Sequence, residues 1–267
     1  MFNMSQRMTA FGLALTLMGV TSVFTACEKK KDPTYSIGFN FHLVGQGADT
    51  PDFRARVERL LETSRVVLEK VKMNIGSVEY YIHTGNDANR LTYLDDWDDN
   101  DGSGIPDKWE ELISWSSKAQ NNNIDIFLVR SIGGDYGILG YSGGIPGPAR
   151  KGTSQSGLIL NTFGNIYSMP DGDLSLQGET LIHEAGHYLG LWHTTERKGM
   201  DFDPLSDTPE CPSWSYDFDS DGLVSPKECY NQDGQYLMFW AAADFEQHIL
   251  SGQSVDVIKT HPWVKEE

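Results

Sequence analysis

Two histidines four residues apart, followed by a glycine and a third histidine, constrain this chain more than any other feature. Residues 183–193 read His-Glu-Ala-Gly-His-Tyr-Leu-Gly-Leu-Trp-His. On a helix, His183 and His187 lie on one face, one turn apart, so a single zinc ion can accept a nitrogen from each. Gly190 can adopt a left-handed conformation that ends the helix, which would let the chain turn and bring His193 in as a third ligand.

This spacing predicts a zinc site of the catalytic kind. Three protein ligands leave one coordination position open for water. Glu184, next to the first histidine, projects towards that open side and can act as a general base. The alternative is a surface helix with scattered histidines. The remaining histidines lack such spacing and are expected to be structural or solvated: His42, His83, His248 and His261.

The first 26 residues are typical of a secretory signal. Arg7 precedes an apolar run over residues 11–20, which is about half the length that a membrane helix needs. Residues 24–27 read Phe-Thr-Ala-Cys and resemble a bacterial lipobox, so Cys27 is expected to carry a lipid that anchors the chain to a membrane. The alternative is an ordinary signal peptide followed by an unmodified cysteine.

The lipobox has consequences for location and organisation. It predicts a bacterial cell-envelope lipoprotein of the outer membrane, facing the periplasm or the surface. Residues 27–34 read as a short polar tether. The chain carries 21 Lys and Arg against 38 Asp and Glu, a formal net charge of −17. Because the phosphates of nucleic acids attract cations, nucleic acid is not expected as a partner.

Alternating strand and helix patterns predict an α/β domain with a mixed sheet. A helix is expected after Thr50, with apolar side chains at helical spacing from Phe53 to Val71. The Gly-rich residues 136–142 are expected to form an irregular edge strand. We expect an N-terminal subdomain over 35–193 and a C-terminal subdomain over 194–267. The other strands are expected at 35–44, 78–83, 124–129 and 158–160.

Two acidic loops predict calcium sites. Each has acidic or hydroxyl side chains at alternate positions, a glycine for the sharp turn and a closing glutamate. The alternative for each loop is an acidic turn that binds no metal. The predicted ligands in residues 217–228 are Asp217, Asp219, Asp221, Leu223 and Glu228. Those in residues 99–110 are Asp99, Asp101, Ser103, Ile105, Asp107 and Glu110.

The stretch from His183 to His193 resembles the signature of the metzincin clan of zinc metalloendopeptidases. Within that clan the chain is most similar to the pappalysin family, and the resemblance covers roughly residues 120–252. The similar pieces are residues 132–134, 138–141, 186–194 and 206–209, the cysteine pair, and a Met-containing turn at 235–240.

The resemblance implies a metzincin-like fold, with a twisted mixed sheet, a backing helix, an active-site helix and an irregular C-terminal subdomain. It implies a zinc endopeptidase that hydrolyses internal bonds of proteins or peptides, with Glu184 as the base that takes a proton from a metal-activated water. Met238 would form the Met-turn, and Asp207 would meet a calcium ion. Trp240 stands where the family usually has a tyrosine, and it cannot supply that hydroxyl.

Cys211 and Cys229 are the cysteines that follow Cys27. In an exported protein such a pair is expected to form a disulfide, and the alternative is two buried thiols. Two other functions stay open. One is a catalytically silent, calcium-binding surface lipoprotein that keeps the protease fold for adhesion or binding, although Glu184 and all three motif histidines are present. The other is an aminopeptidase.

Overall fold

The computed structural model describes residues 34–134 and 137–267. The predicted signal peptide, the predicted lipidation site Cys27 and all but the last residue of the predicted tether lie outside these ranges. From residue 33 onward the chain clusters as one compact unit. In the described ranges, no helix combines the length and apolar character needed to cross a membrane.

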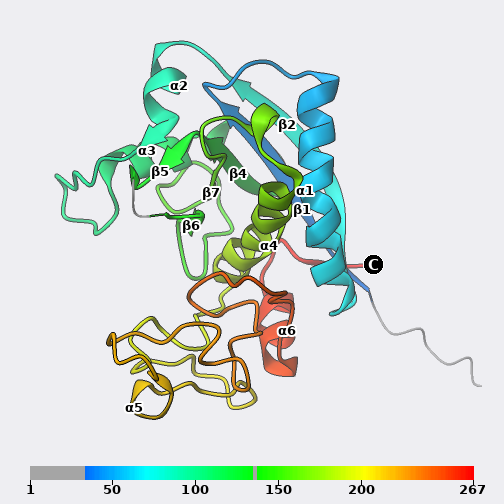
Figure 1. Ribbon diagram of the computed structural model, residues 1–267. Helices are drawn as coiled ribbons and strands as arrows, with labels where there is room; N and C mark the ends of the chain where they lie inside the picture. The colour runs from blue at the N-terminus through cyan, green and yellow to red at the C-terminus, as the bar shows by residue number, and fades with distance from the viewer. Residues whose placement is uncertain (1–33, 135–136) are drawn as a thin grey trace, which may run out of the picture. The chain divides into compact units, whose positions relative to one another are not determined.

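The main sheet is mixed, as predicted, with the strand order β2-β1-β4-β7-β6 (Figure 1). Neighbouring strands are parallel from β2 to β7, and β6 runs antiparallel to β7 at the edge. A short C-terminal strand, β8, pairs with the start of β1. The strands are β1 (Tyr35–Val44), β2 (Met73–His83), β4 (Ile124–Val129), β6 (Gly140–Ser142), β7 (Leu158–Asn161) and β8 (Lys265–Glu266). A separate parallel pair consists of β3 (Tyr93–Leu94) and β5 (Ser131–Ile132).

Two long helices cross one face of this sheet (Figure 1). They are α1 (Pro51–Glu69), the backing helix, and α4 (Asp171–Tyr188), the active-site helix. The shorter helices are α2 (Asn86–Leu91), α3 (Asp107–Ser114), α5 (Ser213–Tyr216) and α6 (Gly252–Lys259), with the 3-10 turns η1 (Trp115–Lys118) and η3 (Ile166–Ser168).

The central strands β1, β4 and β7 are buried on both faces. Phe39, Phe41 and Leu43 of β1 are buried in the core that α1 and α4 complete. The next residue of β1, Val44, belongs instead to a second core on the opposite face, together with Phe127 of β4. Successive strand residues point to opposite faces, so both faces need apolar side chains when helices or loops cover each of them.

Helix α1 begins where the sequence predicts. The Thr50 hydroxyl accepts a hydrogen bond from the Phe53 N–H at 3.1 Å, and Pro51 occupies the first turn, where its missing N–H costs nothing. The apolar face of α1 packs against α4, and the Ser64 hydroxyl donates to the Gly178 carbonyl at 2.9 Å. A Cβ on Gly178 would lie 2.4 Å from the Leu60 carbonyl oxygen, so the glycine permits this close helix contact.

Three strands differ from their predicted bounds, and β7 differs only in ending at Asn161 rather than at residue 160. Strand β2 begins at Met73 rather than at residue 78, because Met73 and Ile75 pair with Tyr35 and Ile37 before the register shifts. Gly76 interrupts the alternation of side chains there and conceals these pairs in the sequence. In the Gly-rich stretch 136–142, only residues 140–142 form a strand, while residue 136 lies outside the described residues.

After α4 the chain has little regular structure. Only the short helix α5 and two isolated β-bridges interrupt the loops between residues 189 and 251. A disulfide between Cys211 and Cys229 links this region, as the sequence predicted, and the buried Val224 and Phe239 pack around it. The disulfide thus adds a covalent restraint to a region that backbone hydrogen bonds between its loops also connect.

Candidate active site

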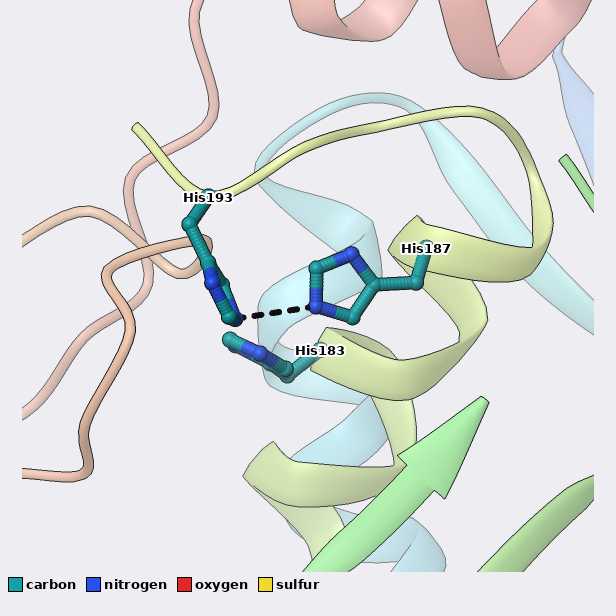
Figure 2. Close-up of side chains that lie close together, drawn as sticks. All are labelled: His183, His187 and His193. Atoms are coloured by element: carbon teal, nitrogen blue, oxygen red, sulfur yellow. Dashed lines mark hydrogen bonds between the residues drawn. The ribbon is translucent and has the colours of Figure 1, made fainter. Parts of the chain in front are cut away.

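The end of α4 positions two of the three motif histidines. His183 and His187 lie one turn apart on the helix, which ends at Tyr188. Gly190 has a φ of +110°, a left-handed value that side chains disfavour, and the Leu191 N–H bonds back to the Gly186 carbonyl. This glycine turn redirects the chain so that His193 faces the helix (Figure 2).

The three imidazole rings converge on one point (Figure 2). One ring nitrogen of each lies within 4.8 Å of those of the other two. The Nδ1 atoms point the other way: that of His183 lies 2.6 Å from the Leu237 carbonyl, and that of His187 lies 2.7 Å from the Leu191 carbonyl. Because a carbonyl only accepts, each Nδ1 carries the proton, and each Nε2 offers a lone pair.

This geometry fits a divalent metal ion. Nε2 of His187 lies 3.1 Å from Nε2 of His193. Two unprotonated nitrogens so close repel each other unless a cation, either a shared proton or a metal, lies beside them. Burial and the neighbouring imidazole lower the pKa of His183 to about 4, which suits a neutral ligand. Neutral imidazole nitrogens are the donors that zinc prefers at such sites.

Glu196 is a part of this site that our sequence reasoning missed. Its Oε1 lies 3.0 Å from Nδ1 of His193, and the carboxylate thereby fixes the tautomer of the third histidine. The signal that could have revealed it is its place three residues after His193. The Leu237 and Leu191 carbonyls fix the tautomers of His183 and His187 in the same way. Because these are backbone groups, the amino-acid types at those positions do not reveal them.

Glu184 is nearly buried beside the histidines, with 8% of its surface exposed. Loss of hydration raises the pKa of its carboxyl to about 8. Gly140 of β6 packs directly on it, because a Cβ there would lie 2.8 Å from Cγ of Glu184. The edge strand therefore fixes where this carboxyl can go.

A cleft of about 820 Å³ runs along the histidines and Glu184. Its lining includes residues 137–142 with the edge strand β6, residues of α4, and Leu237 with residues 239–243. Trp192 lines the cleft, and 52% of its surface is exposed. Trp240 lines it too, but its indole N–H already donates to the Val224 carbonyl at 2.7 Å.

Met238 is buried directly against the active-site helix. A Cβ on Gly186 would lie 2.6 Å from the sulfur of Met238, so only glycine allows this approach. The Met238 carbonyl accepts the N–H of Thr194, the residue that follows the third histidine. The predicted Met-turn residue thus braces both segments that carry the histidines.

The structure brings together part of each predicted calcium loop. Side-chain oxygens of Asp217, Asp219 and Glu228 lie within 4.8 Å of one another, and one oxygen of Asp217 is buried without a hydrogen-bond partner. The oxygens of Asp99, Asp101 and Asp107 form a second such group. Of the predicted carboxylate ligands, Asp221 and Glu110 are outside these groups. Leu223, Ile105 and Ser103 would contribute backbone or hydroxyl oxygens, so for them the calcium sites stay a prediction.

The remaining histidines are buried and hydrogen-bonded, as expected of structural residues. His42 contacts His83 and Asp125 at 2.8 Å each. His261 donates to the Gly147 carbonyl at 3.2 Å, and His248 contacts Glu179 at 2.6 Å. Asp207, which the family resemblance suggests as a calcium ligand, accepts hydrogen bonds from the backbone near the start of α6.

A family model described as peptidase M43, pregnancy-associated plasma protein-A, matches residues 115–253, slightly more than half of the chain. The matched stretch contains the histidine motif, Glu184, both disulfide cysteines and Met238. It coincides with the region of resemblance found in the sequence. A search of curated proteins found no match.

The solved structures that are similar to this chain include the following two. Archaemetzincin from Methanopyrus kandleri has a TM-score of 0.43 and 12% identity, covering 84% of this chain and 94% of its own. Metalloproteinase-II from Bacteroides fragilis has a TM-score of 0.34 and 15% identity. The alignment with it covers 63% of this chain but only 47% of the Bacteroides protein.

Proposed function

The chain belongs to the peptidase M43, or pappalysin, family, and from this premise we propose that it is a zinc endopeptidase with Glu184 as its general base. Family membership makes it a metallopeptidase whose substrates are proteins or peptides. The observation that carries the finer proposal is the convergence of three Nε2 lone pairs beside a buried carboxyl in an open cleft.

His183, His187 and His193 would hold the metal. Bound there, zinc would supply Lewis acidity and make water a stronger acid. The protons on the opposite ring nitrogens are retained by the Leu237 and Leu191 carbonyls and by Glu196, so the rings keep one orientation. The ligands are therefore fixed in place before any substrate enters.

Glu184 would move the protons. As a carboxylate it can accept a proton from the attacking water, and as a carboxylic acid it can donate that proton to the leaving amine. Burial favours the neutral acid and so strengthens its power to take up a proton. Gly140 restricts the side chain to a place beside the histidines.

The edge strand would bind the substrate main chain. Strand β6 pairs with β7 on one side and is the last strand in the sheet order, while its residues line the cleft. An extended peptide could add there as a further strand, with main-chain hydrogen bonds that do not depend on its sequence. This mode of binding suits cleavage within a chain rather than at its end.

Casein hydrolysis by the zinc-loaded full chain, with and without a chelator, tests the proposal. We expect chelator-sensitive cleavage, and Glu184→Ala should retain zinc while losing turnover by at least about 100-fold. Wild-type protein that binds zinc yet cleaves no more casein than Glu184→Ala would support the binding lipoprotein instead.

Calcium would stabilise the two acidic loops. The buried, unpartnered oxygen of Asp217 supports this for residues 217–228, since an uncompensated carboxylate oxygen is costly to bury. For residues 99–110 the support is the close approach of Asp99, Asp101 and Asp107. Calcium would offset the repulsion within each group.

We further propose that Cys27 carries a lipid that anchors the enzyme in the bacterial cell envelope. The support is the short apolar run that ends in Phe-Thr-Ala-Cys. Expression of the full chain in a bacterium tests this: wild type should fractionate with membranes, and Cys27→Ala should not.

A further inference from the structure

Trp240 is a cleft residue to which the proposed reaction assigns no step. Its side chain lines the cleft, but its indole N–H donates to the Val224 carbonyl at 2.7 Å. Val224 is fully buried beside the disulfide between Cys211 and Cys229. An indole has one N–H donor and no acceptor, so this bond uses all the hydrogen-bonding capacity of the side chain. Trp240 is therefore tied to a residue that does not itself line the cleft.

The backbone of Val224 holds another segment at the same time. Its N–H donates to the Arg197 carbonyl at 3.1 Å. The guanidinium of Arg197 in turn lies over an aromatic ring of Trp240, with Cζ 5.7 Å from the ring centroid. These three contacts close a cycle among segments that are at least 16 positions apart in the sequence.

This cycle borders the residue that orients the third histidine. Arg197 directly follows Glu196, whose Oε1 lies 3.0 Å from Nδ1 of His193. The Glu196 side chain is 42% exposed, so water competes for its carboxylate and the contact by itself is a weak restraint. The position of the Glu196 backbone therefore decides whether the carboxylate meets the imidazole ring.

The chain before Glu196 is held independently. The Thr194 N–H donates to the Met238 carbonyl at 2.9 Å, in the same turn that carries Trp240. This turn thus contacts the histidine-bearing segment directly before Glu196, and through Val224 after it. A backbone that is fixed on both sides leaves the Glu196 carboxylate few positions, which is what precise orientation of a ligand requires.

We propose that Trp240 is a positioning residue of the zinc site, which fixes Glu196, and through it the third histidine, by its bond to Val224. The inference rests on the proposed function, since it assigns a role within that site. Loss of the indole N–H would leave the buried Val224 carbonyl without this donor and loosen the segment that carries Glu196. Zinc affinity should then fall, because the outer hydrogen bonds of a ligand set its orientation.

Two variants remove the indole N–H. Trp240→Phe keeps an aromatic ring, and Trp240→benzothienylalanine keeps the size and shape of the indole with sulfur in place of the N–H. Zinc affinity is measured on the full chain by titration against a competing chelator. Substrate is left out, because Trp240 lines the cleft and its replacement could alter substrate binding directly. Both variants should bind zinc about ten-fold more weakly than wild type.

The matched control is Trp214→Phe. Trp214 lies within the disulfide loop and is 75% exposed, so its replacement should leave zinc affinity unchanged. Urea unfolding of the zinc-free proteins is measured in parallel. It shows how far each substitution lowers the stability of the fold.

A double-mutant cycle with Glu196→Ala separates positioning from a general loosening of the fold. If Trp240 acts through Glu196, its replacement costs little once that carboxylate is gone. Adding Trp240→Phe to Glu196→Ala should therefore lower zinc affinity by less than about two-fold further.

Unchanged zinc affinity in both Trp240 variants overturns the proposal, even where urea unfolding shows lower stability, since that result describes a structural role alone. A ten-fold loss that persists undiminished in the Glu196→Ala background overturns it too, as does an equal loss in Trp214→Phe. If Trp240→Phe fails to fold, the benzothienylalanine variant decides. Coupled zinc affinities in a protein that cleaves no casein would reject the endopeptidase and retain Trp240 as a positioning residue.

Discussion

Nε2 of His187 lies 3.1 Å from Nε2 of His193, although the two residues belong to different segments. The glycine turn at Gly190 creates this approach, and a proton or a metal ion must lie beside the paired nitrogens to make it favourable. The position of His193 depends further on Glu196, which holds its Nδ1.

Removal of the Glu196 carboxylate should weaken metal binding. Glu196→Ala leaves Nδ1 of His193 without its acceptor, so the ring loses its fixed orientation and the zinc affinity should fall about 10- to 100-fold. Titration against a competing chelator measures this. Glu196→Gln keeps an acceptor oxygen and should lose less, and equal affinity in all three proteins would contradict the assigned role.

A methyl group at residue 140 should disturb Glu184 without affecting the metal. The added Cβ would lie 2.8 Å from Cγ of Glu184, so the carboxyl must move. We expect Gly140→Ala to lower kcat/KM roughly 10- to 100-fold with unchanged zinc content. Gly172→Ala is the control, because that glycine begins the same helix with no atom nearby. Normal activity of Gly140→Ala would show that the contact is dispensable.

The buried pair of His42 and His83 should make the fold sensitive to acid. Burial lowers the pKa of His42 and lowers that of His83 to about 3, whereas the unfolded chain takes up these protons near 6.5. Between those values the unfolded state binds more protons, so stability is full above pH 6.5 and falls as the pH drops towards 3.

For His83 alone this amounts to about 2 kcal/mol between pH 6.5 and 5. Urea unfolding at a series of pH values measures it. His83→Gln removes one of the two titrating groups, so its stability should depend less steeply on pH in this range. Parallel pH profiles for the two proteins would mean that His83 does not titrate as its burial implies.

Loss of the disulfide should destabilise the C-terminal region. The link between Cys211 and Cys229 closes a loop with a sequence separation of 18, which corresponds to about 3 kcal/mol of stability. Urea unfolding of Cys211→Ser/Cys229→Ser against wild type measures the difference. A change below about 1 kcal/mol would indicate that packing around Val224 and Phe239 suffices.

Calcium should raise the melting temperature of the zinc-loaded protein through the loop at 217–228. Binding to the folded state alone stabilises it in proportion to the logarithm of free calcium above the Kd. Asp217→Asn should abolish most of the rise, while Asp244→Asn, an exposed acid outside both groups, should leave it intact. An unchanged melting temperature of wild type in calcium would favour the metal-free acidic turn.

Local patterns in the sequence were sufficient for much of the fold. The cap at Thr50, the alternation in β1 and the apolar runs of β4 and β7 predicted elements that the structure contains. The start of β2 was missed because Gly76 breaks its pattern and only pairing with β1 reveals the strand. Neighbour-to-neighbour patterns predict an element, whereas a partner strand decides where it begins.

By itself the sequence determined which histidine side chains come together at the candidate site. A helix repeats every 3.6 residues, so His183 and His187 share one face once their segment is helical. The glycine turn at Gly190 then brings His193 towards that face. Only the tertiary structure decided what surrounds them: the Leu237 carbonyl on His183, Gly140 against Glu184, and His248 behind Glu179. Those contacts join residues between 44 and 69 positions apart, as from Gly140 to Glu184 or from Glu179 to His248, and no local periodicity encodes such pairs.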